Sequence, residues 1–137
     1  MITKTLTMTL AMAAVLLATR QVSACDTWIC SVTAAVAVDE DGTVGPPDMA
    51  GRERPTFFRV DAGKKELTLL GPESRRGEVT KLETLHESEG ATVLTGMEHG
   101  RSVSLVIAAD GRMTLSILGD GVVWSVFGHA LPEGKPE

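Results

Sequence analysis

The sequence contains no tyrosine and only three phenylalanines and two tryptophans among its 137 residues. Proteins that hold single-stranded nucleic acids stack the bases on aromatic side chains, and this composition disfavours such a platform for bases or sugars. Basic side chains are also in the minority, 13 against 18 acidic ones, which gives a formal net charge of −5. Because an acidic surface repels phosphate groups, we expect neither nucleic acid nor an anionic membrane as a partner.

Motifs that carry chemistry are missing as well. No serine lies in a GxSxG elbow, and no cysteine and histidine form the pattern of an activated thiol. The three histidines, His86, His99 and His129, lack the HxH and HExxH spacings, so solvated surface histidines are favoured over a metal site. The acidic residues concentrate in turns, where Asp-Gly pairs are turn formers. We therefore expect no enzyme, no metal and no cofactor, and keep a hydrolase with an unrecognised site as a third hypothesis.

The first 24 residues have the organisation of a secretory signal peptide. Lys4 provides a short basic segment, residues 6–18 are apolar, and Val22-Ser23-Ala24 places small residues where a signal peptidase reads them. The apolar run is shorter than the roughly 20 residues that span a bilayer. We expect an exported protein, periplasmic or secreted, whose residues 25–137 form one small β-domain.

Two cysteines remain after such cleavage, Cys25 and Cys30. The residues Val22-Ser23-Ala24-Cys25 also fit a loose lipobox, in which Cys25 carries a lipid and anchors the chain to a membrane. Arg20 and Gln21 separate this motif from the apolar run, which favours ordinary cleavage after Ala24. An exported chain can form disulfides, so a Cys25–Cys30 bridge is one possibility. In the alternative, Cys30 is a small buried residue on the inner face of its strand.

The chain after the signal is rich in short alternating segments bounded by turn residues. Residues 28–38 form a long first strand, with the even-numbered residues from Trp28 to Val38 on one apolar face. The following Asp39-Glu40-Asp41-Gly42 is a hairpin turn, because a calcium loop with Gly42 at its sixth position would begin at Ala37 instead of a carboxylate. Residues 45–55 form an irregular surface connection, in which Arg52-Glu53-Arg54 is a solvated basic spot.

Further strands are expected at residues 56–60, 66–70 and 91–97, and Val93 and Leu94 compete for the inner face of the last of these. Residues 79–86 are ambiguous, because an apolar residue at every third position suits a helix while the threonines suit a strand. The hairpin-like surroundings favour a strand.

Two tight turns set the register from Arg101 to Ala130. A three-residue loop over 109–111 closes a G1-bulge hairpin that pairs Ile107 with Met113, which keeps the apolar residues of both strands on one face. At Asp120-Gly121 the same requirement selects a two-residue type I′ turn that pairs Ile117 with Trp124. Trp124 is therefore predicted to be a core residue.

In total, about eight short strands with a turn every ten residues or so predict an all-β fold. We expect an antiparallel meander, closed or nearly closed into a barrel or a strongly curled sheet. Closure or dimerisation would protect its edge strands from uncontrolled pairing. From about residue 131 the chain is a polar tail that we expect to fray.

Three features resemble short exported proteobacterial β-proteins of unassigned function. They are the early Cys30, the segment Phe58-Arg59-Val60-Asp61, and the ending Ser125-Val126-Phe127-Gly128-His129-Ala130. In such proteins a cysteine often follows the final Phe-Gly and can pair with the early one, whereas His129 and Ala130 occupy that region here. The resemblance implies export and a β fold, and it implies no activity.

These observations favour an exported, non-enzymatic β-domain that binds a small apolar ligand inside the barrel or an envelope protein at its rim. The alternative is an envelope-structural or inhibitor-like lipoprotein module, which would touch the membrane only through a lipid on Cys25. A packed interior would argue against the ligand carrier, and a hollow one would support it.

Overall fold

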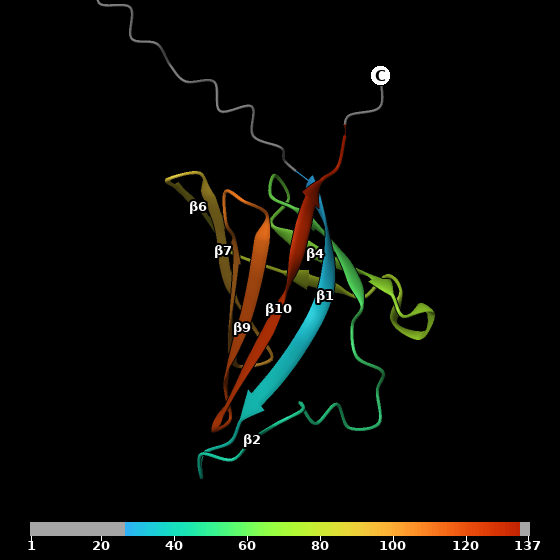
Figure 1. Ribbon diagram of the computed structural model, residues 1–137, viewed down its shortest axis with the longest axis vertical. Helices are drawn as coiled ribbons and strands as arrows, with labels where there is room; N and C mark the ends of the chain where they lie inside the picture. Colours follow the sequence, from blue (N-terminus) through green and yellow to red (C-terminus); the bar gives the residue numbers. More distant parts are fainter. Residues whose placement is uncertain (1–26, 135–137) are drawn as a thin grey trace, which may run out of the picture.

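The computed structural model describes residues 27–134, which form one antiparallel sheet curled into a half-barrel (Figure 1). The strands are β1 (Thr27–Val38), β2 (Val44–Gly45), β3 (Phe57–Asp61), β4 (Glu66–Gly71), β5 (Val79–Lys81), β6 (Thr84–Ser88), β7 (Ala91–Glu98), β8 (Arg101–Ile107), β9 (Arg112–Gly119) and β10 (Val122–Pro132), with a short 3-10 helix η1 (Glu73–Arg75). Their order is β5-β4-β3-β1-β10-β9-β8-β7-β6, and β2 pairs with β1. The predicted all-β, strongly curled architecture is confirmed. In the described range no helix is long and apolar enough to span a membrane.

Both hairpins of the β8–β10 meander have the predicted register. Ile107 pairs with Met113, and Gly111 closes that turn with a φ of +87°. Ile117 pairs with Trp124 across a turn in which Asp120 and Gly121 both have positive φ, as a type I′ turn requires. Local turn chemistry and the requirement for one apolar face are therefore sufficient to fix these strands.

The first strand differs from the prediction. Its register with β10 shifts between Val32 and Ala34, so Thr33 is an extra residue in a β-bulge. The bulge exchanges the two faces of the strand: Ala37 is buried, whereas Val38 is exposed. The prediction of a single apolar face from Trp28 to Val38 was wrong beyond Val32, because the alternation of small apolar residues hides the inserted position.

The two edges of the sheet are joined by the short segment between β5 and β6. The amide of Leu82 donates to the carbonyl of Lys65 beside β4, and the amide of Glu83 donates to the carbonyl of Thr95 on β7. Leu82 is 6 % exposed and belongs to the core. The ambiguous residues 79–86 are thus extended, as predicted, but they form two strands on opposite edges of the sheet.

The core fills the inner face of the curled sheet between β3, β8 and β10. Leu94 supplies the inward side chain of β7, which settles its competition with Val93. At the other end of the chain, β10 extends to Pro132, and Arg59 binds Glu133 through two hydrogen bonds of 3.0 and 2.8 Å. The ordered strand therefore runs further than the sequence predicts. The buried hydrophobic cluster consists of Trp28, Cys30, Phe58, Val60, Ala62, Leu67, Leu82, Leu94, Val103, Leu105, Ile107, Met113 and Ala130.

Candidate functional site

A hollow of about 300 Å³ lies on the outer face of the sheet, where β3, β1 and β10 run side by side. The turn between β8 and β9 forms one of its walls. It is lined by Ile29, Ser31, Phe57, Asp110, Gly111, His129, Ala130 and Leu131.

Cross-strand pairing brings these side chains together from distant parts of the sequence. Ser31 pairs with Phe57 on one side and with His129 on the other, so the three lie in one row across the sheet. In the next row, Ile29 pairs with Leu131. Because neighbours in such a row lie about 5 Å apart, the hollow is a property of the strand order and has no continuous sequence motif.

The walls are unusually apolar for an outer surface. Phe57 is 50 % exposed and Leu131 is 71 % exposed, while Ile29 is half-buried between their strands. Phe127, two residues before His129 on β10, is exposed as well. Large apolar side chains that gather on the surface of a soluble domain indicate an interaction site.

The rim of the hollow is polar and firmly held. The carbonyl of Gly111 accepts the amide of Ala130 at 2.7 Å, which fixes the β8–β9 turn against β10. The carboxylate of Asp110 accepts the backbone amide of Arg112 at 3.1 Å and its Nε at 2.7 Å. The backbone hydrogen bond from Arg112 lowers the pKa of Asp110 below its ordinary value, so this edge of the hollow carries a negative charge at neutral pH.

Ser31, His129 and Asp110 are the residue types of a hydrolase triad, but their bonding does not form one. The Ser31 hydroxyl donates to the backbone carbonyl of His129 at 3.5 Å, and Arg112 holds the Asp110 carboxylate. Among the hydrogen bonds of residues 27–134, none joins the His129 ring to Ser31 or Asp110. These three residues therefore do not activate Ser31 as a nucleophile. Together with the apolar walls they form an apolar hollow with polar edges.

The structure separates the other residues that the sequence singled out. His86 lies on β6 and His99 in the turn between β7 and β8, whereas His129 lies on β10 at the hollow. Within residues 27–134 no group of three His, Cys, Asp or Glu side chains could hold a metal ion. His129 is the one candidate histidine that the fold places in an apolar hollow, and nothing in its local sequence indicates this.

Cys30 is a free thiol on the inner face of β1 and is completely buried. Its burial raises the pKa of the thiol to about 12, so it is neutral and unreactive in the folded protein. Cys25 lies outside the described residues, and with it the sites of the two alternatives raised by the sequence, lipidation of Cys25 or a bridge to Cys30.

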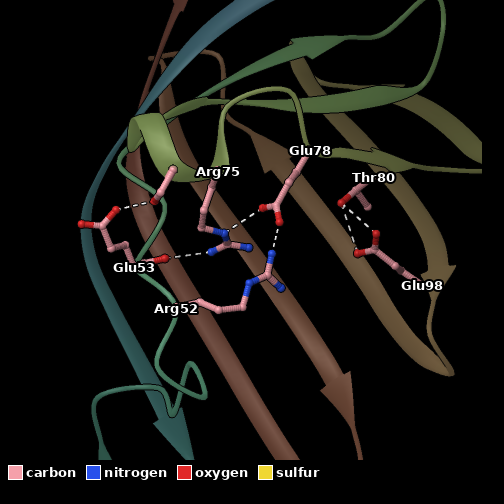
Figure 2. A network of polar contacts seen from close by, with 7 residues as sticks. Arg52, Glu53, Arg75, Glu78, Thr80 and Glu98 are labelled. Carbon is pink, nitrogen blue, oxygen red and sulfur yellow. Dashed lines mark hydrogen bonds and ion pairs between the residues drawn. The ribbon is translucent and has the colours of Figure 1, made fainter.

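The basic spot Arg52-Glu53-Arg54 lies in an exposed loop, as the sequence predicts, and a surface network of polar contacts connects this loop to η1 and Glu78 (Figure 2). Arg52 and Arg75 form ion pairs with the same carboxylate, that of Glu78. Arg75 also donates to the carbonyl of Glu53 at 3.0 Å. Partial burial and the neighbouring Arg52 lower the pKa of Arg75. Both guanidinium groups serve the packing of the loop after β2.

Trp124 is half-buried and is absent from the core, which corrects the prediction for this residue. The guanidinium carbon of Arg101 lies 5.3 Å from the centre of its ring, in the range of a cation–π interaction, and Arg101 also binds Asp120 at 2.9 Å. The pairing of Trp124 with Ile117 was predicted correctly. The curl of the sheet leaves this end of the inner face less covered than a closed barrel would.

No protein-family model, no curated protein and no solved structure matches this chain. The chemistry of the hollow therefore has to support a function by itself.

Proposed function

We propose that the protein is an exported, non-enzymatic binding domain whose outer hollow receives an apolar side chain of an envelope protein. The observation that carries this proposal is the hollow of about 300 Å³ with Phe57 and Leu131 exposed in its walls. The inner face of the sheet is the alternative place for a ligand, and the protein's own buried core side chains occupy it. A protein partner at the surface is therefore favoured over a small ligand carried inside.

The size and openness of the surface define what can enter. Sites for small molecules have volumes of roughly 300–1,000 Å³, so this hollow is at the lower limit and suits one branched or aromatic side chain. Asp110 adds a negative charge at the edge of the hollow. The ion pair between Asp110 and Arg112 is exposed, and exposed ion pairs contribute little free energy. A basic residue next to the apolar one can compete for that carboxylate. The expected partner segment is an apolar residue followed by a basic one.

An NMR titration of the mature chain with three short peptides tests this proposal. The peptides carry Leu-Arg, Ser-Arg or Leu-Glu between the same Gly-Ser flanks. The Leu-Arg peptide should shift the amides of Ile29, Ser31 and Leu131, and the other two should bind at least several-fold more weakly.

The matched variants are Leu131→Ser in the hollow and Val79→Ser on β5, where the valine is exposed outside it. Leu131→Ser should abolish the shifts and Val79→Ser should leave them unchanged. Binding that is equal for all three peptides, or that survives Leu131→Ser, would contradict the proposal. Saturable binding of an apolar dye without any peptide response would instead favour a small-ligand carrier.

Export itself belongs to this proposal and rests on residues 1–24. Cleavage after Ala24 would release a periplasmic or secreted chain, and lipidation of Cys25 would give a membrane-anchored module. The intact mass of the mature protein separates the two, because acylation adds several hundred daltons. An uncleaved chain would refute both.

A further inference from the structure

The outward face of β7, β8, β9, β10 and β1 is free of charge over three successive rows. Residues that alternate with the core positions point outward, and the register places three of them from each strand side by side. Not one is Asp, Glu, Lys or Arg, although the chain has 31 such residues by its count of 13 basic and 18 acidic. These positions are Val93, Thr95 and Met97; Ser102, Ser104 and Val106; Thr114, Ser116 and Leu118; Val123, Ser125 and Phe127; and Ala34, Val36 and Val38.

The middle row is a ladder of hydroxyl groups. Thr95 pairs with Ser104, Ser104 with Ser116, and Ser116 with Ser125. The ladder continues onto β6, where the hydroxyl of Thr84 is hydrogen-bonded to that of Thr95. The two flanking rows carry large apolar side chains, among them Met97 (55 % exposed) and Leu118 (44 % exposed).

In an antiparallel sheet with one face in water, apolar inward residues normally alternate along each strand with polar or charged outward residues. A neutral face with exposed Met, Leu, Phe and Val side chains on an acidic chain marks a surface that is covered in solution. Charged residues return just beyond the three rows, where Arg112 begins β9 and forms an ion pair with Asp110 of the preceding turn.

We propose that a second copy of this chain covers the face, related by a twofold axis that lies in the interface along the hydroxyl ladder. Two copies with a net charge of −5 repel each other, and they repel least where neither presents a charge. A twofold interface must also be complementary to itself.

The ladder runs across the strands. A twofold rotation about it places each strand over the same strand of the second copy, and each flanking row over the other flanking row of that copy. On β9, Leu118 then lies over Thr114, and on β10 Phe127 lies over Val123, so a larger side chain meets a smaller one. The hydroxyls of Ser116 face each other at the centre, where each can donate and accept a hydrogen bond, directly or through water.

The size of the face predicts a weak association. Because the sheet is curled, its outer face bends away on both sides of β9, and close contact is limited to β8, β9 and β10. Three strands at about 4.8 Å and three rows at about 6.8 Å give a contact of roughly 14 by 20 Å, or about 600 Å² for two copies. That area is smaller than a stable dimer needs and suits a weak, transient one. The dimer should dissociate on dilution through the micromolar range.

Sedimentation velocity over a concentration series of the Cys25→Ser mature chain tests the dimer. The wild-type face should give a monomer at low micromolar and a dimer near millimolar concentration. Leu118→Lys, which puts a charge into both copies, should weaken association at least tenfold. Val79→Lys, at an exposed valine of β5 outside the face, should not change it. A monomer at every concentration, or a dimer indifferent to Leu118→Lys, would overturn the proposal.

A second measurement does not depend on the stability of that variant. Under mild oxidation Ser116→Cys should form an intermolecular disulfide much faster than Ser74→Cys, which lies in η1 away from the face. Equal rates would overturn the proposed axis. Leu131→Ser should leave the dimer intact, so failure of the dimer and failure of the hollow as a binding site are distinguishable.

Discussion

Cys30 on β1 lies directly opposite Ala130 on β10, and both side chains are buried in the core. The amide of Ala130 donates to the carbonyl of Gly111, on the side of β10 away from β1. The pair is therefore of the non-hydrogen-bonded kind, in which the Cα atoms are about 4.5 Å apart. This spacing lies within the range that a disulfide spans.

Ala130→Cys should consequently form a disulfide with Cys30 when the reduced, unfolded chain is refolded under oxidising conditions. The bridge closes a loop of about 100 residues, for which the entropy of the unfolded chain predicts a stabilisation of up to about 5 kcal/mol. Urea unfolding of the oxidised and the reduced variant measures it. A variant that remains fully alkylatable after oxidation and denaturation would contradict the register at this position.

Gly128 is the residue whose replacement should cost most in the strand pairing of β1 and β10. A Cβ at this position would lie 1.8 Å from the backbone oxygen of Ser31, next to the bulge at Thr33. Since backbone has to move, Gly128→Ala should destabilise the fold by about 3 kcal/mol. Gly45→Ala is the control, because nothing lies within 4 Å of its added Cβ. Equal urea midpoints for the two variants would show that the strands do not approach so closely.

The neutral thiol of Cys30 makes stability depend on alkaline pH. Burial raises the pKa of the thiol from its ordinary value of 9.0 to about 12, so the folded state keeps a proton that the unfolded state loses above pH 9. The free energy of unfolding should be unaffected by this group below pH 9 and fall between pH 9 and 12, by about 4 kcal/mol in all.

Cys30→Ala removes that dependence. The stability difference between the wild type and Cys30→Ala should therefore shrink as the pH rises from 9, measured by urea unfolding at each pH. A difference that stays constant across this range would show that the thiol is not buried as described.

The two tryptophans should differ in fluorescence. Trp28 is buried in the core, whereas Trp124 is half-buried beneath Arg101. In the Trp28→Phe variant, Trp124 should emit at longer wavelength and be quenched by iodide, which the guanidinium group attracts. Trp28 in the Trp124→Phe variant should be blue-shifted and poorly quenched. The opposite ranking would return Trp124 to the core.

The sequence predicted what local chemistry determines. The turns at Gly111 and at Asp120-Gly121, with the requirement for one apolar face, were enough to pair Ile107 with Met113 and Ile117 with Trp124. The bulge at Thr33 escaped prediction because small apolar residues occupy both faces of β1. The exposure of Trp124 depends on the curl of the sheet, which no local pattern encodes.

The hollow could not be predicted for a related reason. Its walls require β1 to lie between β3 and β10, and that adjacency joins residues about a hundred positions apart. Each lining residue by itself is an ordinary strand residue. Sequence patterns identify the strands of such a site, but only the strand order identifies the site.

The position of β1 between β3 and β10 also affects when the chain can fold. The first strand of the domain makes its longest pairing with the last one, over residues 28–38 and 123–132. Synthesis at about 5–20 residues per second separates the two by roughly 5–20 s. Throughout that interval the longest strand pair of the sheet cannot form. A chain of this design cannot complete its sheet until β10 has been made.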